Sequence, residues 1–91
     1  MKKYYWEIEK MYIYFLKEEM LRHFETGDYY ISYGIGVYTV HNNRKYRAKY
    51  IGDVFLQRRQ AERLVKMCNQ NQLHPLHLEN VIEDMLCRGV L

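Results

Sequence analysis

Several residue types that would direct a fold or a chemistry are scarce in this chain of 91 residues. Proline occurs once, at Pro75, and cysteine twice, at Cys68 and Cys87. The lack of a Pro-rich or low-complexity stretch excludes a linker, which predicts a single domain over residues 1–91. Two cysteines are too few for a disulfide scaffold and are typical of reduced thiols in a cytosolic protein.

Long apolar runs are also lacking. The longest, from Met11 to Leu16, is far shorter than the roughly 20 residues that a membrane-spanning helix needs. The opening Met1-Lys2-Lys3 is not followed by the apolar core and small-residue cleavage site of a secretion signal. We therefore expect a cytoplasmic location and no membrane partner.

Charge is distributed unevenly although the net charge is only +3. Residues 29–43 hold no Lys, Arg, Asp or Glu, whereas residues 44–66 hold eight Lys or Arg against Asp53 and Glu62, a local net charge of +6. A local basic block can recruit phosphate or an acidic partner, and equally can be a solvated face.

The uncharged stretch and the start of the basic one together predict a β-hairpin over about residues 29–52. Both flanks are rich in β-branched and aromatic residues, and Asn42-Asn43 at the centre tolerates the positive φ of a two-residue turn. If His41 lies opposite Arg44, the numbers of any two paired residues add up to 85. This register places the apolar residues on one face of the hairpin and the basic residues on the other. The apolar face then holds Ile35, Val37, Tyr46, Ala48 and Tyr50, and the basic face holds Gly34, Gly36, Tyr38, Val40, Lys45, Arg47 and Lys49.

The N-terminal third fits two patterns. One face of a helical wheel collects Tyr4, Tyr5, Ile8, Met11, Tyr12, Phe15 and Leu16, which favours a helix, and we expect one over Tyr12 to Phe24 with Gly27 as its C-cap. The alternative for the first ten residues is a strand from Tyr4 to Glu9, because aromatic residues favour pleated surfaces.

Two helices are predicted after the hairpin, at about residues 56–70 and 75–88. Apolar residues repeat at i, i+3, i+4 and i+7 in both, and Pro75 suits the first position of the second helix. The core-facing residues expected from this spacing are Ala61, Leu64, Val65, Cys68, Leu78, Val81, Ile82 and Met85. The predicted fold class is α+β: a small antiparallel sheet on the central hairpin, packed against these helices, with an N-terminal helix or strand plus helix.

Three short motifs carry a resemblance to a known family. Tyr33-Gly34-Ile35 opens a strand, the step from Ile51 to Asp53 leads into a helix, and Pro75-Leu76-His77-Leu78 precedes Val81-Ile82-Glu83-Asp84-Met85-Leu86. From Tyr33 to Leu86 the chain resembles a family of small uncharacterised clostridial-type (Firmicutes) proteins of unknown function. The resemblance implies a tyrosine-rich strand at Tyr4 to Glu9, and it supplies no assigned activity that could be carried over to this chain.

Two surfaces are candidate binding sites. A sheet face that offers cations beside aromatic rings can neutralise phosphates and stack on bases, so the basic face and the following helix are candidates for binding a partner or a nucleic acid. Those residues are Tyr38, Lys45, Arg47, Lys49, Arg58 and Arg59. If residues 4–16 are helical, Trp6, Ile13 and Tyr14 lie off the core stripe and form a candidate protein interface.

Metal and catalytic sites are poorly supported. Cys68, His74, His77 and Cys87 are zinc-ligand types, but their spacing is that of no standard site, and we predict no metal and no cofactor. Ser32 has no evident catalytic partners, and the four histidines are scattered, so we predict that the protein is not an enzyme.

The expected function is that of a small interaction module that binds another protein, as a regulator or inhibitor or by forming a homodimer. Small aromatic-rich proteins of bacteria or their mobile elements often act in this way. The alternative is a nucleic-acid-binding protein that uses the basic face of the hairpin and the following helix.

Overall fold

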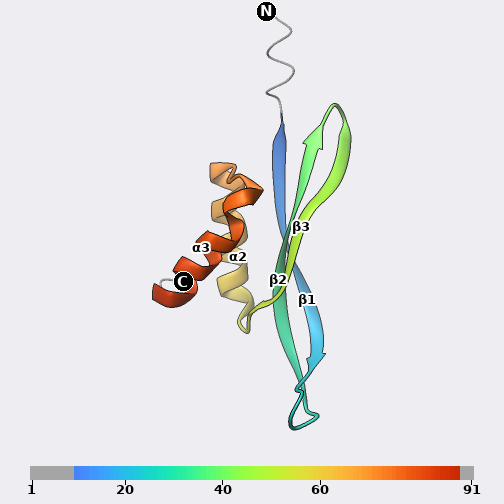
Figure 1. Ribbon diagram of the computed structural model, residues 1–91, viewed down its shortest axis with the longest axis vertical. Coiled ribbons are helices and arrows are strands. Elements are labelled where there is room, and N and C mark those ends of the chain that lie inside the picture. The colour runs from blue at the N-terminus through green and yellow to red at the C-terminus, as the bar shows by residue number, and fades with distance from the viewer. Residues whose placement is uncertain (1–9, 89–91) are drawn as a thin grey trace, which may run out of the picture.

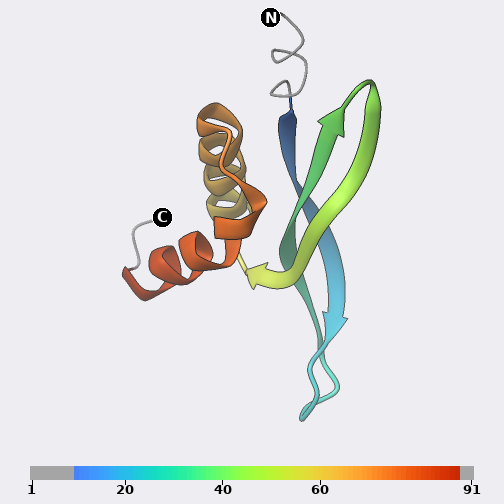
Figure 2. The ribbon, with the colours of Figure 1, turned by 45° about the horizontal axis from the view of Figure 1, so that its top comes forward.

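Three antiparallel strands and two α-helices make up residues 10–88, the part of the chain that the computed structural model describes. The elements are β1 (Met11–Arg22), β2 (Tyr29–His41), β3 (Arg44–Phe55), α2 (Arg58–Asn71), the 3-10 turn η1 (Pro75–His77) and α3 (Leu78–Arg88). The sheet order is β1-β2-β3, and both helices lie on the same side of the sheet (Figures 1 and 2). The predicted α+β fold is confirmed, with a third strand in place of an N-terminal helix.

The hydrophobic core lies between this sheet and the helices. The sheet contributes Tyr14, Ile35, Val37 and Phe55, and the helices contribute Ala61, Leu64, Cys68, Leu78 and Ile82. The helical residues that we expected in the core are all buried or packed against it. Each large apolar side chain buried in this way stabilises the fold by roughly 1.5–3 kcal/mol.

The polar connection between the helices ends in a tight turn at Pro75. Pro75 is the first residue of η1, where its missing N–H costs nothing, and the Leu76 N–H donates to Nδ1 of His74 over 3.1 Å. The α-helix proper begins three residues later, at Leu78, so the predicted start at 75 includes the 3-10 turn. Leu78 is thereby fully buried.

The prediction of a helix from Tyr12 to Phe24 is wrong, because Met11–Arg22 forms β1, which pairs with β2 along its whole length. Both faces of this strand carry large apolar residues: Tyr14 packs into the core and Phe15 packs on the opposite face. A strand that is apolar on both faces lacks the usual alternation, so its residues also fitted a helical wheel. Gly27 does have positive φ, +80°, but it shapes the β1–β2 turn. The strand that we considered at Tyr4 to Glu9 lies outside the described residues.

The outer edge of β1 is closed along its first half by two side chains, Asn69 in the last turn of α2 and Gln72 at its C-cap. The Tyr14 N–H donates to Asn69 Oδ1 over 2.7 Å, and Asn69 Nδ2 donates to the Tyr14 carbonyl over 3.1 Å. Gln72 makes the same pair of bonds with the backbone of Tyr12, at 2.8 and 2.9 Å. Each side-chain amide thus replaces one residue of a neighbouring strand and fixes α2 along the sheet.

The β2–β3 turn forms as predicted. Asn42 and Asn43 have φ of 53° and 62°, and the pairs His41–Arg44 to Tyr38–Arg47 follow the expected register. Beyond them a β-bulge shifts the register by one residue, so that Val37 pairs with Lys49 and Gly36 with Tyr50. The predicted pairs of Val37 with Ala48, Gly36 with Lys49 and Ile35 with Tyr50 are therefore wrong.

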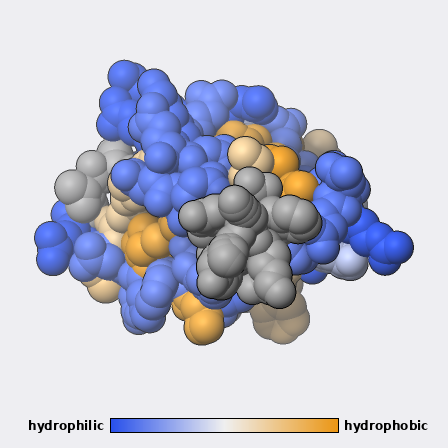
Figure 3. Space-filling view, turned by 90° about the horizontal axis from the view of Figure 1, so that it is seen from above, coloured by the Kyte–Doolittle hydropathy of each residue, from blue (hydrophilic) through white to orange (hydrophobic). Residues whose placement is uncertain are grey.

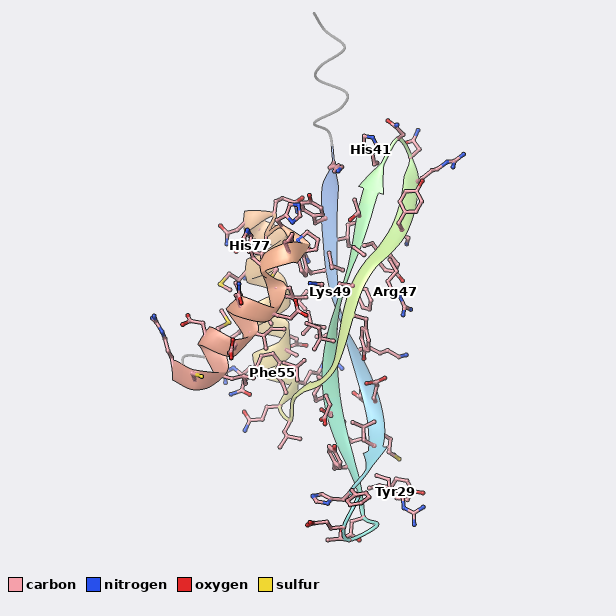
Figure 4. All side chains as sticks on the ribbon, in the orientation of Figure 1. Tyr29, His41, Arg47, Lys49, Phe55 and His77 are labelled. Carbon is pink, nitrogen blue, oxygen red and sulfur yellow. The ribbon has the colours of Figure 1, made fainter. Side chains whose placement is uncertain are left out.

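The bulge places Lys49 and Tyr50 each on the face opposite to the predicted one. Lys49 points toward the helices, whereas Arg47 points away from them (Figure 4). Tyr50 moves to the face opposite the helices, where it contacts Phe15. Of the predicted apolar face, Ile35 and Val37 are buried, while Tyr46 and Ala48 are exposed.

Candidate functional site

The candidate site is the face of the sheet that the helices leave uncovered, which we call the open face. All three strands contribute to it, and its residues alternate with those that enter the core. They are Ile13, Phe15, Lys17 and Glu19 from β1, Tyr38 from β2, and Lys45, Arg47 and Tyr50 from β3. At the end of the molecule nearest the β2–β3 turn, by contrast, the surface is mainly hydrophilic with small separate apolar patches (Figure 3).

A row of three stacked rings crosses the open face. The centroid of Phe15 lies 5.0 Å from that of Tyr38, with 27° between the ring planes, and 6.4 Å from that of Tyr50, with 15° between the planes. Offset stacking at such distances is favourable beyond the area that it buries. The row joins one residue from each strand and so holds the sheet together on the side that has no helices.

Two glycines of β2 make room for these rings. A Cβ atom on Gly36 would lie 2.2 Å from Cζ of Phe15, and one on Gly34 would lie 2.2 Å from the Tyr50 hydroxyl oxygen. The rings of β1 and β3 therefore lie directly on the backbone of the central strand. The sequence had indicated a bulge or a close approach at these glycines, and the approaching groups are the protein's own aromatic side chains.

Cations flank the row of rings. Lys45 Nζ lies 4.6 Å from the centre of the Tyr38 ring, Arg47 Cζ lies 5.9 Å from that of Tyr50, and Lys17 Nζ lies 5.8 Å from the same ring. Cation–π contacts at such exposed positions contribute roughly 0.5–1 kcal/mol each. Their charged groups still face solvent, and Lys17 Nζ also lies 3.9 Å from Oε2 of Glu19, so Lys45 and Arg47 are the two that can bind an anionic group without giving up an ion pair.

Tyr50 is the most constrained of the three rings. Its hydroxyl is buried next to the Glu19 carboxylate, although without a hydrogen bond of good geometry. Burial first, and the nearby Glu19 second, raise the pKa of Tyr50 to about 12. The phenol is thus neutral at physiological pH and is held in place by packing.

The six residues predicted to bind a partner or a nucleic acid do not lie on one surface. Tyr38, Lys45 and Arg47 lie on the open face, as expected. Lys49 lies on the other face, where it donates to Glu79 Oε1 over 2.7 Å and to the Pro75 carbonyl over 3.2 Å. Arg58, at the start of α2, is paired with Glu62 at 2.9 Å and Glu18 at 3.4 Å, and Arg59 also belongs to α2. The assignment of Lys49 to the basic face is therefore wrong.

Of the three residues predicted as a protein interface, Trp6, Ile13 and Tyr14, the two that the structure describes do not lie on one surface. Ile13 lies on the open face with 41% of its surface exposed. Tyr14 is 3% exposed and its hydroxyl donates to the Leu73 carbonyl over 2.6 Å, so its placement on a free surface is wrong. Burial raises the pKa of Tyr14 above its ordinary value. Trp6 lies outside the described residues.

Four residues of the open face were missed by sequence reasoning: Phe15, Lys17, Glu19 and Tyr50. The first three were assigned to a helix, and Tyr50 was assigned to the core because the bulge was not foreseen. The available signal was the Gly34-x-Gly36 pair, since glycine in a strand often indicates a large ring from a neighbouring strand lying across it.

The remaining polar residues with chemical potential have structural roles. Ser32 is fully buried, and its hydroxyl lies 2.6 Å from Asp53 Oδ1, which holds Asp53 in its positive-φ conformation within a second irregularity of β3. Burial raises the pKa of Cys68 to about 11, while Cys87 is exposed. Within residues 10–88 no group of three or more His, Cys, Asp or Glu side chains could hold a metal ion.

Comparison with known proteins identifies the family and nothing more specific. The family described as "Family of unknown function (DUF6514)" matches residues 5–88, so the chain belongs to this family. No curated protein and no solved structure matches the chain. In the part of the chain that the structure describes, none of the helices combines the length and the apolar character needed to cross a membrane.

Proposed function

We propose that this member of a family of unknown function is a non-enzymatic, cofactor-free cytoplasmic module that binds another protein through the open face. The single observation that carries the proposal is the composition of that face. It presents Phe15, Tyr38, Tyr50 and Arg47 beside the exposed Ile13 on a rigid sheet whose other face is occupied by the core. Aromatic residues and Arg are the types enriched in the centres of protein interfaces.

The charges around the rings indicate the chemistry of the partner. Lys17, Lys45 and Arg47 surround the rings, and the carboxylates that the three strands place on this face are Glu19, beside Lys17, and Asp53, which is already bound by Tyr30 and Ser32. Charges at the rim of an interface mainly guide encounter and exclude wrong partners. The partner that fits is therefore a protein surface with an apolar centre and an acidic rim.

Binding to a protein is favoured over binding to nucleic acid because the basic set is divided. Lys49 and Arg58 are each already paired with a carboxylate, and neither belongs to the open face. The rings that would have to stack on bases already stack on each other and under the cations. A role as an inhibitor of a larger enzyme, and an origin in clostridial-type bacteria or their mobile elements, belong to the same proposal.

The test compares variants on the two faces of the sheet. Ile13→Thr combined with Arg47→Thr changes the open face and keeps residues that are compatible with a strand. Tyr46→Thr is the matched control, since Tyr46 is 52% exposed and neighbours Arg47 but points to the other face. We expect capture of a partner from host lysate by the wild type and the control, and a loss of at least tenfold for the double variant. Equal capture by all three proteins would contradict the proposal.

The second candidate, a nucleic-acid binder, is supported by Lys45 over Tyr38 and Arg47 over Tyr50, which place cations beside rings. A salt titration with single-stranded RNA or DNA separates the two functions. Contact of three cations with phosphates predicts a slope of about −2 for log affinity against log salt. No binding at low salt removes this candidate, whereas salt-dependent binding that Arg47→Thr weakens would favour it over the first.

A further inference from the structure

The two edges of the sheet differ in how well they are protected from pairing with another strand. β3 is interrupted by two register shifts and carries Lys45 and Arg47, and bulges and basic residues of this kind are common means of preventing edge-to-edge association. The first half of the β1 edge is closed by Asn69 and Gln72. The second half of β1 has neither a bulge nor a proline, and its charged residues, Lys17, Glu18, Glu19 and Arg22, are of both signs and so can complement a second copy.

The hydrogen bonds in the first half of β1 show which backbone groups point outward in its second half. Tyr12 and Tyr14 turn their N–H and C=O groups to the outer edge, because these groups bind the two amides. β1 pairs with β2 without interruption, so the even-numbered residues that follow also point outward. Among residues 10–88, none pairs with the outward backbone groups of Glu18, Met20 and Arg22.

We propose that a second copy of this chain pairs with β1 along this half, antiparallel and centred on Met20. In that register Met20 faces Met20 of the second copy, and Glu18 faces Arg22. The three pairs Glu18–Arg22, Met20–Met20 and Arg22–Glu18 each exchange two backbone hydrogen bonds, as opposed residues of an antiparallel ladder do. The result is a two-fold symmetric dimer with one continuous six-stranded sheet.

Charge complementarity favours this register over those centred on Glu18 and Glu19. Pairing centred on Glu18 or on Glu19 would place two like carboxylates face to face, which is destabilising. Pairing centred on Met20 instead places two opposite-charge pairs on the same face, with the 67%-exposed Met20 side chains between them. It also brings Phe24, which is 96% exposed, toward Leu16 of the second copy.

α2 is bound to the first half of β1 through Tyr12 and Tyr14, and the helix reaches the second half through the Arg58 side chain, 3.4 Å from Glu18. Antiparallel pairing centred on Met20 sends the first halves of the two copies, with their helices, in opposite directions. Because opposed residues keep the same face, the open faces of the two copies become one surface. The dimer does not depend on what that surface binds, so failure of either proposal leaves the other testable.

Sedimentation velocity tests the stoichiometry. We expect the full chain to change from 11.2 kDa at low concentration to twice that mass at higher concentration. Glu18→Arg and Arg22→Glu should each weaken association about tenfold, since each places two like-charge pairs in the dimer, and the combined variant should restore it. Circular dichroism confirms that each variant is folded.

Cysteine cross-linking tests the register. In a Cys87→Ser background, Met20→Cys should form a disulfide dimer with oxidised glutathione, because directly opposed residues lie within bridging distance. Ile31→Cys is the matched control, since Ile31 pairs with Met20 inside the chain on the same face but lies one strand further from the axis. A protein that stays monomeric up to about 1 mM, or cross-linking no faster at position 20 than at position 31, would overturn the proposal.

Discussion

Replacing Gly36 by Ala tests whether the rings of the open face lie on the backbone of β2. Gly36 does not have positive φ, so its backbone accepts a side chain. The added Cβ would meet the Phe15 ring at 2.2, 2.6 and 2.8 Å. Because Phe15 is held between Tyr38 and Tyr50, the ring cannot move aside without losing its stacking.

The magnitude follows from two opposing effects. Overpacking against a confined ring costs about 1–3 kcal/mol, whereas Ala is more stable than Gly inside a strand by about 0.5–1 kcal/mol when there is space for its Cβ. Gly36→Ala should therefore destabilise the wild type and stabilise a Phe15→Ala variant. The gain of Ala over Gly is common to both backgrounds and cancels, so the coupling energy between the two changes is the overpacking cost, about 1–3 kcal/mol.

Urea unfolding of the wild type, the two single variants and the double variant measures this coupling, provided that their m-values agree. Gly52→Ala is the matched control: a Cβ there would have its closest contact, at 3.4 Å, with the flexible end of Glu19, so its effect should not depend on Phe15. If Gly36→Ala changes stability with the same sign in both backgrounds, the rings do not lie on the backbone of β2.

Three further predictions concern the edge, the phenol and the bulge. Asn69→Ala should cost about 2–4 kcal/mol in urea unfolding, because it leaves two part-buried backbone groups without partners, whereas Gln72→Ala should cost less than about 1 kcal/mol because water reaches the exposed groups there. The pKa of Tyr50 rises from its ordinary value of 10 to about 12 on folding, so its contribution to stability is complete below pH 10 and is lost as the pH rises from 10 to 12. The midpoint of urea unfolding should therefore fall over this pH range, and Tyr50→Phe should make that fall less steep. An unchanged fall in the variant would refute the assignment. Lys49→Glu should cost about 1–2 kcal/mol, because it replaces an ion pair with α3 by like charges. Arg47→Glu, two residues away on the open face, should cost less, about 0.5–1 kcal/mol, because it loses only its contact with the Tyr50 ring. A larger cost for Arg47→Glu than for Lys49→Glu would mean that Arg47, and not Lys49, faces the helices.

The parts of the fold that local chemistry determines could be predicted from the sequence. Asn42 and Asn43 fixed the turn, the spacing of Ala61, Leu64 and Cys68 identified the buried stripe of α2, and Pro75 located the start of the last turn and helix. Each of these signals depends on residues within one or two turns of each other. None requires knowledge of what packs against the element.

β1 could not be predicted in this way because its pattern depends on distant partners. Its apolar residues face two different environments, the core for Tyr14 and the aromatic row for Phe15, and both environments are built by later parts of the chain. The amides that close its edge come from Asn69 and Gln72, more than fifty positions away. In sequence, Asn69 lies at the end of the predicted helix 56–70 and Gln72 just after it, and neither indicated a contact with β1.

The bulge at Ala48 explains why the basic face was only partly right. The alternation of Lys45, Arg47 and Lys49 argued against a slip of the whole strand, since that would bury three cations. A bulge shifts only the residues beyond it, so Lys45 and Arg47 stay on the open face while a single cation changes sides. The cost for Lys49 is small, because its long side chain reaches Glu79 and the Pro75 carbonyl at the edge of the helices. In exchange Tyr50 joins Phe15, which turns a basic face with one ring into an aromatic surface with a basic rim.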